Sequence, residues 1–419
     1  MSKAISCDIF CAVVDNYGDI GVCWRLARQL ANEQGVTVRL WVDDLKSLQR
    51  LCPEVDIARD EQRCRGVVVR HWSKVFPPLT KPLSLGGERV VADLVIAAFA
   101  CKLPESYVAA MAAQQHKPVW INLEYLSAED WIDTHHKLPS PHPCLPLTKY
   151  FFFPGFTPKT GGLLLERDLL ARRDAFQRDP QAVAAYWQSL HVPQPQADEL
   201  RVSLFSYENA ALPELLRAWE QGAQPVTCLV PEGRILPQVE QYFGGVGRDL
   251  SRQKLHVGIN PDLRRGSLRV HVLPFVEQER YDELLWACDI NFVRGEDSFV
   301  RAQWAGKPCI WQIYPQHDGV HMHKLRAFMA RYCAGLPPDA ARAVQHLWEG
   351  WNGEPGLESA ALSGLGQAWN DFAAHRPMLT KHAQVWAQEL SGNSLALNLL
   401  DFSREVGRMR PFEIEAGKS

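Results

Sequence analysis

The stretch CDIFCAVVDNYGDIGVCWRLARQLANEQGVTVRLWV, residues 7–42, decides the fold class. Residues 7–14 are mostly apolar and predict a buried strand, and residues 37–42 predict a second strand. Between them, Val22, Leu26 and Leu30 recur on one face of a helix predicted over residues 22–34. A strand, a helix and a strand within about forty residues form a βαβ unit, which implies a parallel sheet.

The same alternation continues along the chain. Further strands are predicted at residues 66–70, 94–98 and 118–123, whereas residues 138–162, with six prolines, are predicted to form a long loop. After the linker-like HVPQPQ at residues 191–196, strands are predicted at residues 201–206, 225–230, 268–273, 290–293 and 309–313, with helices at residues 213–221, 282–288 and 300–305.

Two domains are expected because 419 residues are long for a single core. The predicted fold is α/β, with two Rossmann-like domains facing a central cleft as in GT-B glycosyltransferases; periodicity alone fits a two-domain dehydrogenase or binding protein as well. We expect a first domain over residues 1–170, a linker over 171–198 and a second domain over 199–380. Residues 381–419 are expected to be C-terminal helices, which can return to the first domain.

Composition excludes several classes of protein. A net charge of −3 and a pI near 6.5 argue against nucleic-acid binding. The most apolar stretch, residues 90–100, is too short to span a bilayer and contains Asp93, and no signal peptide precedes it, so a cytoplasmic protein is expected. The eleven cysteines form no CxxC pair and are expected to be reduced thiols. The sequence contains no G-x-G-x-x-G and no Walker motif, which argues against binding of NAD or ATP.

Two carboxylates stand in the loop after the first strand. Asp15 and Asp19 are four residues apart in DNYGDIG, residues 15–21, where Gly18 and Gly21 allow tight backbone geometry. Ligands bind at the carboxyl ends of strands in open α/β sheets, so both acids could converge on one cation or proton. The structural alternative is that Asp19 caps the following helix and Asp15 braces the turn.

A second polar loop, RGEDS, covers residues 294–298 between a predicted strand and a helix. With Asp297 or Ser298 as N-cap, the helix start would offer backbone amides to a diphosphate, and Arg294 would add a bidentate contact. Glu296 would repel such a ligand and therefore needs a sugar hydroxyl, an acceptor cation or Arg294 as its partner. The structural alternative is a capped helix with an Arg–Glu ion pair.

Aromatic residues end two strands of the second half. Phe205, Tyr207 and Phe275 could stack on a nucleobase, although an aromatic residue at such a position is, taken alone, more often part of the core. His317, His321 and His323 resemble metal ligands, but their spacing matches no established motif, and a polar loop near the donor site is expected instead.

The chain resembles the elongation factor P arginine rhamnosyltransferases. The stretches that carry the resemblance are DNYGDIGVCWRLARQL (15–30), LWVDD (40–44), NLEYLSAEDW (122–131), TGGLLLERD (160–168) and RGEDSFVRAQWAGKPCIWQIYPQ (294–316). The resemblance implies a metal-independent, inverting GT-B enzyme that uses dTDP-β-L-rhamnose, needs no cofactor and modifies an arginine of translation elongation factor P, its protein partner. It also implies that the domain over residues 1–170 receives elongation factor P and that the domain over residues 199–380 binds the nucleotide sugar. The sequence alone does not identify the sugar.

Position by position, the resemblance also implies roles. Asp15 and Asp19 match the family's acceptor-side catalytic aspartates, with Asn16, Tyr17 and Gly18 between them, and Glu296 matches its essential glutamate. Residues matching the donor site are the diphosphate loop Arg294, Asp297 and Ser298, the thymine sandwich Phe205 and Phe275, Gln278 at the base edge, and the tyrosines Tyr207 and Tyr314. Tyr17 departs from a phenylalanine found in some relatives, a conservative change.

Two other functions remain open on the residues. One is a GT-B nucleotide-sugar enzyme that acts on a small molecule, and the other is a non-catalytic docking protein for a translation factor. Acids in both polar loops weigh against a pure docking protein, since such a protein needs no acids beside a diphosphate site. Which of Asp15, Asp19 and Glu296 takes the proton is not decided by the residues; the resemblance favours Asp19.

Overall fold

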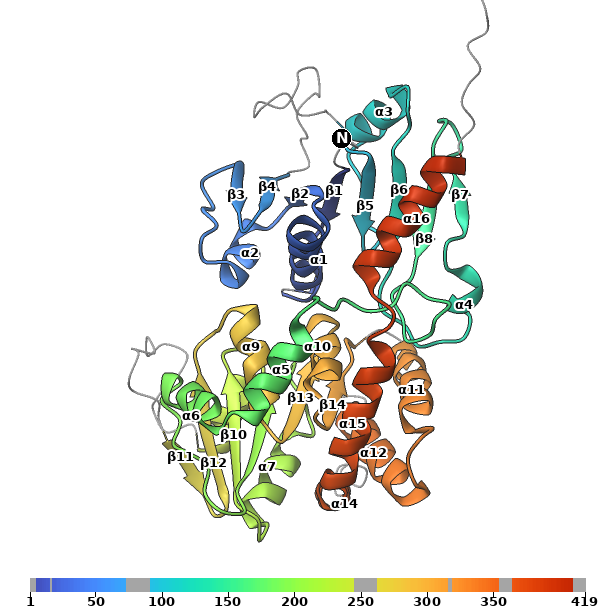
Figure 1. Ribbon diagram of the computed structural model, residues 1–419. Coiled ribbons are helices and arrows are strands. Elements are labelled where there is room, and N and C mark those ends of the chain that lie inside the picture. The colour runs from blue at the N-terminus through green and yellow to red at the C-terminus, as the bar shows by residue number, and fades with distance from the viewer. Residues whose placement is uncertain are drawn as a thin grey trace, which may run out of the picture. The chain divides into compact units, whose positions relative to one another are not determined.

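The computed structural model describes residues 5–15, 17–72, 91–244, 262–315, 319–353 and 364–409. The side chains of residues 262, 408 and 409 are not described. Contacts divide the chain into two units (Figure 1). Unit 1 comprises the described residues of Met1–Glu166 and Leu390–Ser419, and unit 2 those of Arg167–Glu389.

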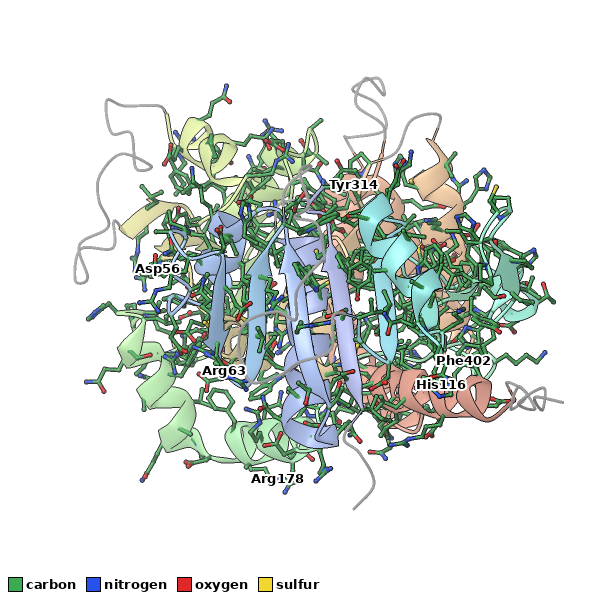
Figure 2. The ribbon with its side chains drawn as sticks, turned by 90° about the horizontal axis from the view of Figure 1, so that it is seen from above. Asp56, Arg63, His116, Arg178, Tyr314 and Phe402 are labelled. Carbon is green, nitrogen blue, oxygen red and sulfur yellow. The ribbon has the colours of Figure 1, made fainter. Side chains whose placement is uncertain are left out.

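Unit 1 is built on an eight-stranded sheet of order β3-β4-β2-β1-β5-β6-β8-β7. Its strands are β1 (Ser6–Cys11), β2 (Thr37–Val42), β3 (Glu61–Cys64), β4 (Val67–His71), β5 (Leu94–Ala98), β6 (Val119–Leu123), β7 (Pro139–Pro141) and β8 (Thr148–Phe152). The strands lie side by side in Figure 2. The inner six run parallel, whereas β3 and β7 pair antiparallel at the two edges.

Helices cover the sheet of unit 1. They are α1 (Gly18–Gln34), α2 (Leu45–Leu51), α3 (Glu105–Ala113), α4 (Ile132–His135) and α16 (Leu395–Met409). Helix α1 begins at Gly18, earlier than the predicted Val22, and its predicted apolar face is buried. The C-terminal helix α16 contacts α1 and β6, and Leu163 pairs with Ser394 in a parallel bridge just before it.

The prediction of one long loop over residues 138–162 is wrong. Thr148–Phe152 forms β8, which pairs parallel to β6, and Pro139–Pro141 forms the edge strand β7. Proline is tolerated on an edge strand because the missing N–H is not needed by a neighbour. The prolines masked the β-forming TKYFF that follows them.

Unit 2 holds a six-stranded sheet of order β11-β12-β10-β9-β13-β14. Its strands are β9 (Leu200–Leu204), β10 (Val226–Pro231), β11 (Asp262–Arg265), β12 (Leu268–Leu273), β13 (Ile290–Arg294) and β14 (Cys309–Gln312). All pair parallel except β11, which is antiparallel to β12. The five strands predicted for this half are therefore confirmed, with ends that shift by one or two residues.

Among the helices of unit 2, two sets of three are linked by contacts within each set. The described helices are α5 (Leu169–Arg178), α6 (Pro180–Ser189), α7 (Leu212–Gln221), α8 (Leu236–Tyr242), α9 (Gln278–Ala287), α10 (Asp297–Ala305), α11 (Val320–Cys333), α12 (Pro338–Trp351), α14 (Leu365–Ala374) and α15 (Arg376–Leu390). Helices α5, α9 and α10 contact one another, and α14 contacts both α7 and α12. Helices α5 and α6 occupy much of residues 171–198.

Each sheet has a point where the order of its strands reverses direction. From β1 the chain first adds β2 and β4 on one side, and later β5, β6 and β8 on the other. From β9 it adds β10 and β12, and then β13 and β14 on the opposite side. Ligands of open α/β sheets bind beyond the carboxyl ends of the strands at such points. The loops after β1, β9 and β13 are therefore the places where the fold supports a site.

The cysteines are free thiols, and most of them, nine of the eleven, are buried. Within the described ranges, no helix combines the length and the apolar character that a membrane crossing needs.

Candidate functional site

In unit 1, the loop after β1 is held by the carboxylate of Asp19. The residue is 4% exposed and lies in the first turn of α1. The backbone N–H groups of Val14 and Asp15 both donate to its Oδ2, each at 2.9 Å. These amides belong to the loop that precedes the helix. Asp19 therefore stabilises the loop and does not cap α1, whose N-cap residue is Tyr17.

Gly18 allows Asp15 to lie close to the start of the helix. A Cβ atom at this position would be 2.6 Å from Asp15 Oδ2, and the Gly18 N–H donates to the Asp15 carbonyl at 2.6 Å. Asp15 braces the turn through this carbonyl, as in the structural alternative, and its side chain is half-buried. The structure thus brings Asp15, Tyr17, Gly18 and Asp19 together at the end of β1, while Asn16 lies outside the described residues.

The pKa of Asp19 is raised above its ordinary value. Burial is the main cause, and the charges of Asp15 and Asp43 add to it, while the hydrogen bonds from the Asp15 and Val14 amides act in the opposite direction. A carboxylate with a raised pKa is a stronger base than an ordinary aspartate, so this loop can both orient a cation and accept a proton.

In unit 2, the guanidinium of Arg294 lies between two aromatic rings. Its Cζ atom is 4.4 Å from the ring centre of Phe205 and 4.7 Å from that of Tyr207. Arg294 Nη1 also donates to the Ser206 carbonyl at 3.4 Å, and only 5% of the residue is exposed. Stacking on both rings restricts the guanidinium to one orientation.

The loop between β13 and α10 differs from the predicted capping scheme. The N-cap residue is Glu296, and α10 begins at Asp297, so neither Asp297 nor Ser298 is the N-cap. Ser298 Oγ instead accepts from the Arg294 N–H at 3.0 Å and donates to the Arg294 carbonyl. Gly295 makes the turn possible, since its φ of 57° favours glycine.

The remaining donor-site candidates lie at the same edge of this sheet. Gln278 starts α9, and its Nε2 donates to Asp297 Oδ2 at 3.2 Å. The half-buried Phe275 lies between β12 and α9. Tyr314 follows β14, is 42% exposed and contacts the Tyr207 ring edge to face, with 5.5 Å between ring centres. Because β9, β12, β13 and β14 are parallel, the segments that follow them all lie at one edge.

Two further residues support this site and were not predicted. The Tyr281 ring lies 5.4 Å from that of Phe205, and burial raises the pKa of its phenol, which therefore stays protonated near Arg294 and Asp297. Gln312 Oε1 accepts from Ser206 Oγ at 2.6 Å and from the Tyr207 N–H at 2.7 Å. Tyr281 follows Gln278 by one helical turn, a spacing that could have identified it.

The histidines do not form the loop that was expected. His321 and His323 lie in α11, and His321 is buried; His317 lies outside the described residues. In the part of the chain that is described, no three His, Cys, Asp or Glu side chains are grouped in a way that could hold a metal ion.

Comparison with known proteins identifies the family. The family described as elongation factor P (EF-P) rhamnosyltransferase EarP matches residues 7–404. The chain belongs to this family. As a member of the EF-P rhamnosyltransferase family it is a glycosyltransferase, and the resemblance inferred from the motifs is confirmed.

Similar proteins cover almost the whole chain. A protein-arginine rhamnosyltransferase of Pseudomonas putida is 50% identical over 400 residues, which are 95% of this chain and 98% of the relative. One from Shewanella oneidensis is 41% identical over 96% of this chain and 99% of its own. A solved structure, described as the structural basis for EarP-mediated arginine glycosylation of EF-P, is 36% identical, with a TM-score of 0.63, and covers 96% of this chain and 99% of its own. The predicted GT-B class with two α/β units is therefore confirmed.

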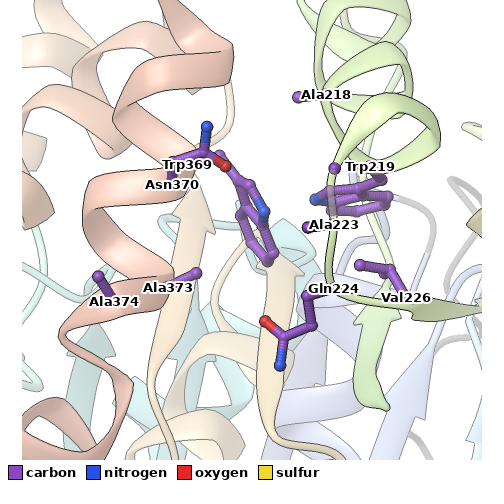
Figure 3. A pocket seen from close by; sticks show the side chains of 10 residues that line it. Ala218, Trp219, Ala223, Gln224, Val226, Trp369, Asn370, Ala373 and Ala374 are labelled. Carbon is purple, nitrogen blue, oxygen red and sulfur yellow. The ribbon is translucent and has the colours of Figure 1, made fainter. Parts of the chain in front are cut away.

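One pocket lies away from these loops. It encloses about 260 Å³ between α7 and α14, with Trp219 and Trp369 in its walls (Figure 3). The two indoles contact each other edge to face, with ring centres 5.1 Å apart. Val226, the first residue of β10, also lines it. This pocket is therefore at the amino ends of the parallel strands, opposite the edge that binds ligands in such folds.

Proposed function

We propose that the protein transfers L-rhamnose from dTDP-β-L-rhamnose to an arginine side chain of EF-P, with inversion at the anomeric carbon. The observation that carries the proposal is the 50% identity, over nearly the whole chain, to a protein-arginine rhamnosyltransferase. The similar solved structure concerns EarP-mediated glycosylation of EF-P, which supports the same acceptor. Because the acceptor is a translation factor, we expect the reaction to occur in the cytoplasm.

An arginine side chain is a poor nucleophile, and this decides what the enzyme must supply. With a guanidinium pKa near ~13.8, full deprotonation at neutral pH would cost roughly 9 kcal/mol, at ~1.36 kcal/mol per pKa unit. A neighbouring carboxylate would raise that pKa further, so deprotonation before the reaction is excluded. Carboxylates must instead orient the guanidinium and take its proton as the C–N bond forms.

We assign the base to Asp19 and the orienting roles to Asp15 and Glu296. Burial raises the pKa of Asp19, which favours proton acceptance. Both loop amides bind the same oxygen of Asp19, so the carboxylate has one defined orientation. Asp15 is fixed beside it by the close approach of Gly18. Glu296, half-buried at the start of α10, contributes negative charge for the cationic acceptor.

The leaving dTDP needs its developing charge stabilised. Arg294 and the amino-terminal amides of α10 are suited to this, since the guanidinium offers two parallel donors and the helix dipole favours an anion at this end. The rings of Phe205 and Tyr207 hold Arg294 ready for the diphosphate, so little reorganisation is needed on binding. We propose that this set of groups takes the role that a divalent metal has in many other nucleotide-sugar enzymes, and that no cofactor is required.

On the base side, we propose that Phe275 and Phe205 stack on the thymine and that Gln278 contacts its edge. Tyr207 and Tyr314 contact each other edge to face, and we assign both tyrosines to the wall of the donor site. One face of Phe205 is already in contact with Arg294, so a base stacked on the other face would extend the same column of rings and guanidinium.

The test compares two donors that differ only in the nucleoside. Purified protein and EF-P are incubated with dTDP-β-L-rhamnose or with UDP-β-L-rhamnose, and the anomeric configuration of the product is determined by NMR. We expect fast transfer from the dTDP donor alone and an α-linked product. A β-linked product would contradict inversion, and equal rates with both donors would contradict the thymine site. Transfer to a small molecule but not to EF-P would favour the alternative of a small-molecule enzyme.

A further inference from the structure

The loop that carries the catalytic aspartates is held by carboxylates from two different elements. Three successive backbone N–H groups, those of Val13, Val14 and Asp15, each donate to a carboxylate oxygen at 2.9 Å. The last two bind Asp19 of α1, and the first binds Oδ1 of Asp43, the residue that follows β2. The end of β1 is thus fixed from the helix on one side and from the neighbouring strand on the other.

We propose that Asp43 is a positioning residue for the transfer reaction, which acts by fixing through Val13 the loop that presents Asp15 and Asp19 to the acceptor guanidinium. The inference rests on the proposed function and adds a third aspartate to its acceptor side. Asp43 is placed for this because β1 and β2 are paired in register, with Cys11 opposite Val42, so the residues after each strand are neighbours.

The backbone of Asp43 is itself anchored from β4. His71 Nε2 lies 3.2 Å from the Asp43 carbonyl oxygen, and the Trp72 N–H donates to the carbonyl of the preceding Val42 at 3.0 Å. The Trp72 indole N–H reaches across to the Cys11 carbonyl at 3.0 Å. The strand ends are therefore fixed without the side chain of Asp43. The Asp43 carboxylate instead binds the first amide of the loop, that of Val13.

Asp43 also contributes charge. It is exposed, and together with Asp15 it adds to the effect of burial in raising the pKa of Asp19. The titratable groups that face Asp19 and Asp43 are Asp15 of the loop, Cys11 of β1, Cys23 of α1, Cys101 after β5 and His71 of β4. Burial raises the pKa values of the Cys23 and Cys101 thiols, so these remain neutral and the aspartates supply the negative charge.

The neighbouring Asp44 provides a matched control. Its carboxylate caps α2 by accepting from the N–H groups of Lys46 and Ser47 at 3.0 and 3.3 Å, and from Ser47 Oγ at 2.6 Å. It contacts the helix and not the loop after β1. Replacing Asp44 therefore removes a cap and the same formal charge, whereas replacing Asp43 removes a loop contact.

The experiment measures kcat, the KM values for donor and acceptor, the pH profile and the Tm of Asp43→Ala, Asp43→Asn and Asp44→Ala in the full chain. For Asp43→Ala we expect kcat to fall by about tenfold, because the loop that presents Asp15 and Asp19 loses one of its three bonds to a carboxylate, with the donor KM unchanged. Asp43→Asn should recover part of the rate, because its amide oxygen can still accept from Val13. In both Asp43 variants the acidic limb of the profile should move to lower pH, since a negative charge near Asp19 is gone.

Asp44→Ala should lower the Tm and leave the kcat and the pH profile of the folded enzyme unchanged. Wild-type kcat and pH profile in Asp43→Ala would overturn the inference. So would a change in Asp44→Ala as large as in Asp43→Ala, because the effect would then be structural. Absence of transfer by the wild-type protein would instead reject the proposed function, so the two failures are distinguishable.

Discussion

Burial of Asp19 is the residue-scale feature that connects stability with chemistry. Its carboxylate is removed from water and placed near Asp15 and Asp43, and two amide hydrogen bonds from described residues compensate in part. The raised pKa means that the folded protein prefers the protonated form more than the unfolded chain does. Stability alone would not favour an ionisable residue at this position. A buried carboxylate with a raised pKa is typical of a functional site.

Asp19→Asn should therefore separate stability from activity. The aspartate of the unfolded chain has its ordinary pKa of 3.8, and the pKa in the folded protein is higher. Between these two pKa values the folded state binds more protons, so wild-type stability falls as pH rises through that window. The variant keeps an acceptor oxygen for the loop amides, and its stability does not fall with pH for this reason, because asparagine does not ionise. Its Tm relative to wild type should increase from pH 4 to pH 7.5, while transfer is abolished and dTDP affinity is unchanged.

Differential scanning calorimetry at the two pH values measures the relative Tm, and isothermal titration calorimetry with dTDP measures the donor affinity. A relative Tm that decreases with pH would show that the charge of Asp19 stabilises the fold. Loss of dTDP affinity in parallel with activity would move Asp19 to the donor site.

Phe275 tests the base side at the same scale. Phe275 is half-buried and lies in the segment of the chain that connects β12 to α9. Phe275→Ala should weaken dTDP binding by ~1–3 kcal/mol, the usual contribution of one stacked base. The loss should be equal for dTDP and dTDP-rhamnose, because the ring contacts only the base. An unchanged dissociation constant for both ligands would make Phe275 a packing residue.

Helices α9 and α10 are the elements that position the donor loops. They contact each other, and the buried pair of Arg301 and Asp282 joins them through two hydrogen bonds of 3.0 and 2.7 Å. Both side chains are 2% exposed. The sequence indicated both helices, but not this pair, since nothing in a helical pattern says which neighbour a buried charge will meet.

Asp282→Ala should strongly destabilise the protein, because it leaves the Arg301 charge buried without its main partner. Breaking such a pair from one side costs about 3–5 kcal/mol, whereas apolar replacement of both partners is often close to neutral. Urea unfolding of Asp282→Ala and of the double variant Asp282→Leu/Arg301→Leu measures the difference. A loss below about 1 kcal/mol in the single variant would mean that Arg301 finds another partner or water.

At the scale of the whole molecule, the sequence was a good guide to the inner strands other than β8, and a poor one to the edges. Inner parallel strands are continuous apolar runs, and strands such as β2 and β5 were predicted with their observed ends. The short antiparallel edge strands β3 and β11, EQRC and DLRR, are too polar to be recognised, and β7 consists mainly of proline. Pairing with a neighbour, and not local pattern, makes them strands.

The same limit applies to the two halves of the site. Polar loops at strand ends were predicted because a βα connection marks them in the sequence. The stack of Arg294 between Phe205 and Tyr207 depends on β9 and β13 being neighbours, which sequence order does not reveal. The anchoring of Val13 by Asp43 depends likewise on the register of β1 and β2. Ser298 was wrongly predicted as an N-cap because its Oγ binds the Arg294 backbone instead.

Metal dependence is a property of the whole reaction. If Arg294 and the amides of α10 stabilise the leaving diphosphate, transfer should survive EDTA, and Arg294→Lys should lower kcat by about a hundredfold, since lysine keeps the charge but loses the two parallel donors. Turnover assays with and without EDTA, repeated for the variant, measure both. Loss of activity on chelation and recovery with a divalent ion would contradict the metal-free proposal and direct attention to the histidines at 317, 321 and 323. Near-normal turnover of Arg294→Lys would place the diphosphate elsewhere.

The central claim is that this chain places a deoxyhexose on an arginine of EF-P. Intact-mass analysis of EF-P after incubation with the protein and dTDP-β-L-rhamnose tests it most directly, with the Asp19→Asn variant as control and fragmentation to locate the modified residue. We predict a gain of one deoxyhexose on a single arginine with the wild-type protein and no gain with the variant. An unchanged EF-P mass with the wild-type protein, or a sugar on any residue other than arginine, would contradict the account.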